Sequence, residues 1–277
     1  MIVQDIVNAM LYRYFPLLLA LCAAGITSFT VSAKSEVIVP VIDVATGQLY
    51  GSVSGNTWLS AIDTQKSVKD SLMLNAYSSD GKLLQKTTVS ATQTSEICLS
   101  PTFRSKMPLP TNAVTLVGSR RNAALRKPEA LDKNNPVYRE AVALWLRERG
   151  IDESYPMLSQ LWRIDLEGDG RDEVLIAATR HRGSETSTQA GDYSLLLLRK
   201  LKGEAVVTIP VFSEIFLETC IAECALQRYE VINLLDIDND GKLEIITKSV
   251  GYESITQTIF SVEGLELKKR LEWSCGS

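Results

Sequence analysis

Acidic residues recur at every second position in the segment 234–249, LLDIDNDGKLEIITKS. Asp236, Asp238 and Asp240 are followed by Gly241 and then by Glu244, which begins an apolar run. Carboxylates this close to one another repel unless a cation lies between them. Ca²⁺ binds six to eight oxygen atoms and tolerates irregular geometry, so it suits a tight acidic loop. The spacing therefore predicts a cation site, for which the main-chain carbonyl of residue 242 supplies a further oxygen.

The same pattern occurs a second time, 71 residues earlier, in the segment DLEGDGRDEVLIAA. Each ligand candidate of one loop has a counterpart in the other, and the matched pairs are Asp165 with Asp236, Glu167 with Asp238, Asp169 with Asp240, the carbonyl of Arg171 with that of Lys242, and Glu173 with Glu244. We predict Ca²⁺ at both loops. The first site should be the weaker one, because the Glu167 side chain has an extra methylene that crowds its position.

Two other interpretations of these loops stay open. An Asx-rich hairpin turn that binds no metal would contain similar residues. Mg²⁺ fits less well than Ca²⁺, because Mg²⁺ prefers to keep its waters. An EF-hand is excluded, since position 12 of the loop holds Ile176 or Thr247 instead of glutamate and the residues that follow look like strands.

In these two loops the chain resembles the FG-GAP/VCBS type of calcium loop, which occurs in integrin α-subunit propellers and in many exported bacterial proteins. That family's pattern is D-x-[DN]-x-D-G-x-x-[DE] running into a strand, and each loop matches it over about ten residues. The resemblance implies the same calcium ligands as the spacing does. Glu167 departs from the pattern, and residues 34–160 show no such resemblance.

The turn signals predict a mainly β protein. Residues 36–118 alternate short apolar stretches with TG, SGN and SDG turns, which is typical of small antiparallel β structure. We expect an N-terminal β region over 34–118, a solvated linker over 119–134, and one packed helix with two blade-like antiparallel repeats over 135–277. Two four-stranded repeats are too few to close a propeller ring. They must pack on each other, on the N-terminal region or on a second copy of the chain.

The one strong helix is predicted directly after the linker. Asn135 can cap it, Pro136 suits its first position, and Gly150 ends it. Four residues share one helical face and are expected to pack against the β structure: Val137, Ala141, Leu144 and Trp145.

The first 33 residues are predicted to be a cleaved signal peptide. Residues 16–31 are apolar and uncharged, and this core is too short to span a bilayer comfortably. The small residues of VSA directly before Lys34 suit signal peptidase. An uncleaved N-terminal anchor is the alternative, and Met10 competes with Met1 as the initiator because MLYRYF is a short basic leader. We expect an exported chain, periplasmic or extracellular, without a stable membrane span after cleavage.

Cysteine usage fits that compartment. Four cysteines follow the predicted cleavage site: Cys98, Cys220, Cys224 and Cys275. An even number in an exported chain favours disulfides over metal thiolates. Three pairings are possible, and the spacing favours 220–224 together with 98–275. The formal net charge of −4 gives no basic field for a nucleic acid.

No catalytic motif stands out in the sequence. The single histidine, His181, lies in a polar loop, and we identify no HExxH, P-loop or dinucleotide fingerprint. The leading hypothesis is an exported, calcium-stabilised, non-catalytic β protein that binds an unidentified protein or glycan at the cell envelope or outside the cell. The alternative is a secreted hydrolase that acts on a polysaccharide or another polymer, for which we expect two close carboxylates in a cleft away from the acidic loops.

Overall fold

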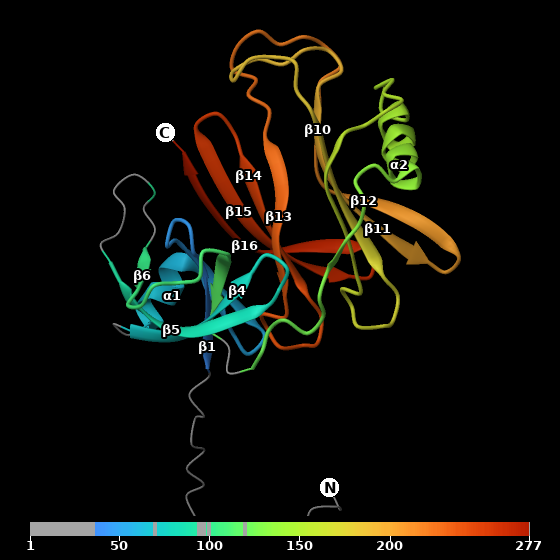
Figure 1. Ribbon diagram of the computed structural model, residues 1–277. Coiled ribbons are helices and arrows are strands. Elements are labelled where there is room, and N and C mark those ends of the chain that lie inside the picture. Colours follow the sequence, from blue (N-terminus) through green and yellow to red (C-terminus); the bar gives the residue numbers. More distant parts are fainter. Residues whose placement is uncertain (1–36, 69–70, 93–97, 99–100, 119–120, 277) are drawn as a thin grey trace, which may run out of the picture. The chain divides into compact units, whose positions relative to one another are not determined.

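The computed structural model describes residues 37–68, 71–92, 98, 101–118 and 121–276, which belong to one compact unit, Glu36–Ser277. The predicted signal peptide, residues 1–33, lies outside the described residues. The described part is mainly β, as the turn pattern predicts, and its strands form three antiparallel sheets accompanied by two helices (Figure 1). None of its helices is long and apolar enough to cross a membrane.

The N-terminal sheet has seven strands in the order β3-β2-β1-β7-β4-β5-β6. The strands are β1 (Ile38–Asp43), β2 (Leu49–Ser54), β3 (Thr57–Ser60), β4 (Ser71–Ser78), β5 (Leu83–Ala91), β6 (Phe103–Ser105) and β7 (Ala113–Val117). The consecutive strands β1–β2, β2–β3, β4–β5 and β5–β6 pair with one another, whereas β7 lies between β1 and β4. Because of this insertion, the sequence order alone does not give the sheet order.

The two remaining sheets contain the acidic loops. The first has the order β12-β11-β10-β9-β8, with strands β8 (Glu129–Ala130), β9 (Leu158–Ile164), β10 (Glu173–Arg180), β11 (Tyr193–Lys202) and β12 (Ala205–Ile215). The second has the order β13-β14-β15-β16, with strands β13 (Arg228–Leu235), β14 (Glu244–Val250), β15 (Ser254–Glu263) and β16 (Glu266–Gly276). In each sheet an acidic loop joins the first two strands of a four-stranded meander, β9–β12 or β13–β16.

The predicted helix is present as α2 (Pro136–Arg147), capped by the side chain of Asn135, which accepts a hydrogen bond from the backbone N–H of Val137 at 3.0 Å. The face that packs differs from the predicted one, because Val137 and Leu144 are exposed. The buried residues are Arg139, Val142, Ala143, Trp145 and Leu146. A second, short helix, α1 (Ala61–Ser67), follows β3 in the region for which the turn pattern predicts only strands.

Buried Arg139 explains part of the difference. Its guanidinium donates to the backbone carbonyl of Lys133 and to the side chain of Asn134, and it lies over the ring of Tyr155. A buried charge is tolerated when it is hydrogen-bonded in this way. Apolar residues lie on both candidate faces of this helix, so hydrophobicity alone does not identify the one that packs.

The sheet β13–β16 packs on both of its faces. Ile245 joins a core with residues of β9–β11, such as Leu196, whereas its neighbour Ile246 joins a core with residues of the N-terminal sheet, such as Tyr50. Successive side chains of a strand point to opposite faces, so a strand buried on both sides is apolar throughout. The two sheets that contain the acidic loops thus pack on each other, and the sheet β13–β16 also packs on the N-terminal sheet. Helix α2 covers the opposite face of β9–β11, where Trp145 lies in the core (Figure 1).

The cysteines pair as the sequence favours. Cys98 is bonded to Cys275 with Cα atoms 5.0 Å apart, and Cys220 is bonded to Cys224 with Cα atoms 6.0 Å apart. The first bond links the segment after β5 to the last strand. Two disulfides indicate an oxidising, non-cytoplasmic location.

Candidate metal centre

The second acidic loop, residues 236–243, is a tight connection between paired strands. β13 ends at Leu235, β14 begins at Glu244, and these two residues are partners in the ladder. The turn needs left-handed backbone at Asn239 (φ 66°) and Gly241 (φ 90°), which asparagine and glycine adopt at the lowest cost. The short loop therefore brings the acidic residues at its two ends together.

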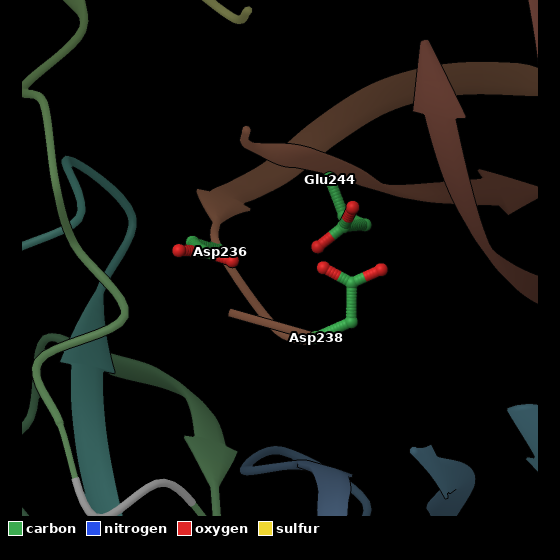
Figure 2. A group of neighbouring side chains, drawn as sticks. All are labelled: Asp236, Asp238 and Glu244. Carbon is green, nitrogen blue, oxygen red and sulfur yellow. The ribbon is translucent and has the colours of Figure 1, made fainter. Parts of the chain in front are cut away.

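Three carboxylates converge in this loop. Asp236, Asp238 and Glu244 each contribute an oxygen atom, and these oxygens all lie within 4.8 Å of one another. Figure 2 shows the carboxylates of Asp238 and Glu244 pointing toward one another, with Asp236 beside them. The exposed fraction is 5% for Asp236 and 1% for Glu244. None of the ion pairs among the described residues includes any of the three.

The electrostatics of the group favour a bound cation. Burial raises the pKa of Glu244 to about 8, helped by the Asp238 carboxylate. Burial also raises the pKa values of Asp236 and Asp238. The Oδ1 atom of Asp236 is buried without a hydrogen-bond partner. Such an atom is costly unless a ligand satisfies it.

The other predicted ligands of the second loop lie outside this group. Asp240 is exposed, and its Oδ1 atom accepts a hydrogen bond from the backbone N–H of Lys242 at 2.8 Å. Asp240 and the Lys242 carbonyl therefore stay sequence-based predictions.

Backbone hydrogen bonds of the first loop, residues 165–172, match those of the second. Glu173 accepts from the N–H of Leu166 at 2.8 Å, as Glu244 does from that of Ile237 at 2.8 Å. The same correspondence holds for the first carboxylate of each loop, which accepts from the glycine five residues later at 3.0 or 3.2 Å. The third carboxylate also matches, because the Oδ1 atom of Asp169 accepts from the N–H of Arg171 at 2.9 Å.

The first loop differs from the second in its charge balance. Glu167 forms an ion pair with the ammonium group of Lys200, whose side chain is 6% exposed. Lys200 lies on β11, 33 residues further along the chain, so loop spacing gives no sign of it. Burial raises the pKa of Glu173, while the N–H of Leu166 and the Lys200 charge oppose this rise. Among the described residues, the carboxylates predicted for the first site do not converge as those of the second loop do. The predicted ligands of the first site are Asp165, Glu167, Asp169, the Arg171 carbonyl and Glu173.

Arg126 joins the two acidic loops. Its guanidinium donates to the backbone carbonyls of Asp165 at 2.5 Å and Leu166 at 3.2 Å in the first loop, and to that of Gly241 at 2.9 Å in the second. A direct backbone bond, from Leu243 N–H to Leu166 O at 2.8 Å, adds to this link. Arg126 belongs to the segment predicted as a solvated linker. Its hydrogen bonds to the two loops join residues far apart in the sequence, so only the folded structure reveals them.

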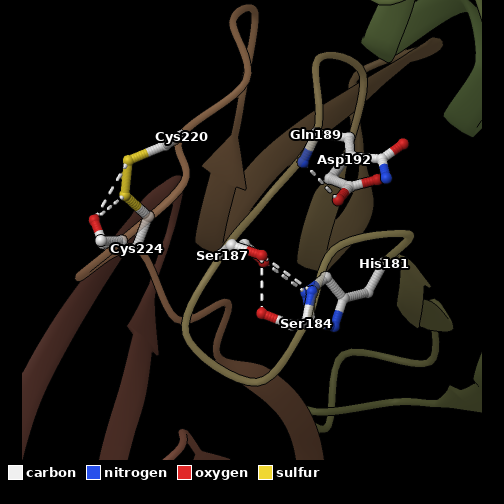
Figure 3. The surroundings of a disulfide bond; sticks show 8 residues. His181, Ser184, Ser187, Gln189, Asp192, Cys220 and Cys224 are labelled. Carbon is white, nitrogen blue, oxygen red and sulfur yellow. Dashed lines mark hydrogen bonds between the residues drawn. A yellow bond between two sulfur atoms is a disulfide. The ribbon is translucent and has the colours of Figure 1, made fainter.

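The loop that contains His181 is held together by structural hydrogen bonds (Figure 3). His181 is exposed, and its Nε2 atom contacts the backbone carbonyl of Ser187 at 3.0 Å. The hydroxyl of Ser187 is instead bonded to that of Ser184 at 2.7 Å. Burial would raise the pKa of Asp192, but hydrogen bonds from Gln189 and Arg182 hold it below its usual value. Among the described residues, the hydrogen bond of the His181 ring is to a backbone carbonyl and not to a hydroxyl or a thiol.

One hollow bears on the hydrolase hypothesis. It has a volume of about 600 Å³, lies next to the Cys220–Cys224 disulfide, and is lined in part by Glu223, Tyr252 and Glu253. The two carboxylates are exposed and lie away from the acidic loops. The hydrolase hypothesis stays a prediction of the sequence.

The chain was compared with family models, with curated proteins and with solved structures. None of them matches it.

Proposed function

We propose that this chain is an exported β protein that Ca²⁺ stabilises by binding at the second acidic loop. In this proposal it acts at the cell envelope or outside the cell by binding a protein or a glycan, and its clustered carboxylates serve as metal ligands instead of catalytic groups. The loops would be calcium loops of the FG-GAP/VCBS type. Asp236, Asp238 and Glu244 would hold the ion.

The observation that carries the proposal is the convergence of these three carboxylates. Their oxygens lie within 4.8 Å of one another, and two of the three side chains are almost fully buried. Buried charges are normally paired or coordinate a metal. Ca²⁺ is the hard cation whose flexible coordination by carboxylate oxygens suits such a loop. The unpartnered Oδ1 atom of Asp236 is a further oxygen that a ligand would satisfy.

Adding Ca²⁺ to chelator-treated protein is expected to raise its melting temperature. A ligand that binds only the folded form stabilises it by about 2.7 kcal/mol at a hundredfold excess over Kd, which corresponds to roughly 5–10 °C for a chain of this size. Thermal melts measure the shift, and titration calorimetry measures the binding heat. Mg²⁺ at the same concentration is the control and should give a smaller shift. A wild-type protein whose melting is indifferent to Ca²⁺, with no binding heat, would contradict the proposal.

Export is expected to remove residues 1–33. Small residues before Lys34 suit signal peptidase, so the intact mass of protein from the envelope fraction should correspond to a chain that begins at Lys34 with its four cysteines oxidised. Substituting Ala33→Leu places a bulky residue directly before the cleavage site and should leave the leader attached. Recovery of wild-type protein with residues 1–33 retained would show that this part of the proposal is wrong.

A further inference from the structure

Lys200 and Ser261 occupy equivalent positions in the two four-stranded meanders, β9–β12 and β13–β16. Lys200 lies on β11, three residues before Gly203, and Ser261 lies on β15, three residues before Gly264. Both glycines are in hairpin turns and have nearly the same left-handed backbone, with φ of 64° and 62°. The two hairpins therefore match residue by residue at this end.

The pairing of β11 with β10 and of β15 with β14 also shows that Lys200 and Ser261 are equivalent. The residue after Glu173 pairs with Arg199, and the residue after Glu244 pairs with Phe260. The next residue along the partner strand is Lys200 in the first meander and Ser261 in the second. Each of them therefore sits beside the glutamate that closes its acidic loop.

The side chains of Lys200 and Ser261 form different contacts with their acidic loops. The ammonium group of Lys200 is an ion-pair partner of Glu167, the third-position acid of the first loop. The hydroxyl of Ser261 donates to Oε1 of Glu244 at 3.1 Å and brings no charge. The nearby base Arg270 donates to Ser261 at 2.9 Å and to Glu263 at 2.6 Å. The charge of Arg270 partly offsets the raised pKa of Asp238, but its ion pair is with Glu263. An acid of the first loop is thus ion-paired to a buried lysine, whereas the carboxylates of the second loop form no ion pair among the described residues.

We infer that Lys200 is the resident cation of the first acidic loop, and that this loop therefore binds no metal. The inference rests on the proposed function only for the second loop, where the short Ser261 leaves a place for an exchangeable Ca²⁺. The loop spacing in the sequence predicts two ions per chain, whereas the structure then holds one. The first loop is then stabilised whether or not calcium is present, and only the second responds to it.

The substitution Lys200→Ser gives the first loop the residue of the second. Native mass spectrometry in Ca²⁺ should count one ion on the wild-type chain and two on this variant. Without Ca²⁺ the variant should melt at a lower temperature than the wild type, because its carboxylates have lost their cation. Ca²⁺ should then raise its melting temperature by more than that of the wild type. Adding Asp165→Asn to the variant should return the count to one, which places the new ion in the first loop.

Two matched variants distinguish the effect of the Lys200 charge from the effect of the length of its side chain. Lys200→Met keeps a long side chain without the charge, so it should melt lower with and without Ca²⁺ and still bind one ion. Ser261→Lys places an ammonium group beside the second loop and should reduce the count from one to zero. Two ions on the wild type, or no added ion on Lys200→Ser, would overturn the inference. No ion on the wild type but one on Lys200→Ser would support it while contradicting calcium binding at the second loop.

Discussion

Replacing Glu244 with glutamine is expected to stabilise the calcium-free protein and to remove most of its response to Ca²⁺. The carboxylate of Glu244 is buried and lies within 4.8 Å of oxygens of Asp236 and Asp238. Because burial raises the pKa of Glu244 to about 8, this carboxylate carries its charge in the calcium-free protein only above that pH. There, two like charges at such a distance repel by roughly 3–4 kcal/mol at an effective dielectric constant of about 20, which is an upper bound for the gain. In the wild type the N–H of Ile237 donates to Glu244 at 2.8 Å, and the amide oxygen of glutamine can still accept this hydrogen bond.

The same substitution weakens the proposed metal site, because it replaces a charged ligand with a neutral one. The calcium-dependent stabilisation, about 2.7 kcal/mol at a hundredfold excess over Kd, should largely disappear. Thermal melts above pH 8, with Ca²⁺ and with chelator, measure both effects. Few substitutions of a buried polar residue raise stability, so a raised melting temperature in chelator together with a lost calcium response distinguishes loss of a ligand from ordinary structural damage.

Glu173→Gln is the matched control, since Glu173 holds the equivalent position of the first loop and makes the same backbone hydrogen bond at 2.8 Å. The positive charge of Lys200 lies near Glu173. Removing the Glu173 carboxylate therefore removes its attraction to Lys200 as well as its repulsion from the neighbouring carboxylates. Its calcium response should equal that of the wild type. A full calcium response in Glu244→Gln, or its loss in Glu173→Gln, would contradict the assignment of the ion to the second loop.

Local features of the fold were predictable because the residues that determine them are close in sequence. The asparagine and proline that begin α2 lie where the sequence indicates. The mainly β class follows from the same short-range turn and alternation signals. The place of β7 between β1 and β4 depends on long-range pairing, which no local pattern specifies.

The site was predictable only in part, for the same reason. The three carboxylates that meet in the second loop are separated by at most eight positions, so their spacing reveals them. Lys200 and Arg126 reach the loops from β11 and from the segment before β8. Each is an ordinary basic residue in the sequence, and only the folding of distant strands gives it an acidic or carbonyl partner. Charge balance at such a loop is thus a tertiary property.

Removing the Cys98–Cys275 disulfide is expected to cost far more stability than removing the Cys220–Cys224 disulfide. The two bonds have sequence separations of 177 and 4. In the chain-entropy model the longer loop corresponds to about 5 kcal/mol of stabilisation and the shorter one to about 2 kcal/mol, because cross-linking restricts the unfolded chain more when the loop is long. Both cysteines of the long-range bond also pack at the core between the N-terminal sheet and β13–β16, so their removal loosens that contact.

Urea unfolding of two double-serine variants measures the difference. Cys98→Ser with Cys275→Ser should shift the unfolding midpoint to much lower urea, whereas Cys220→Ser with Cys224→Ser should shift it by less than half as much. The second variant is the matched control, since it also replaces two partly buried cysteines. Equal losses in both variants would show that sequence separation does not determine the contribution of these bonds. An unchanged midpoint in the first variant would show that packing between the sheets, and not the disulfide, holds the last strand to the N-terminal region.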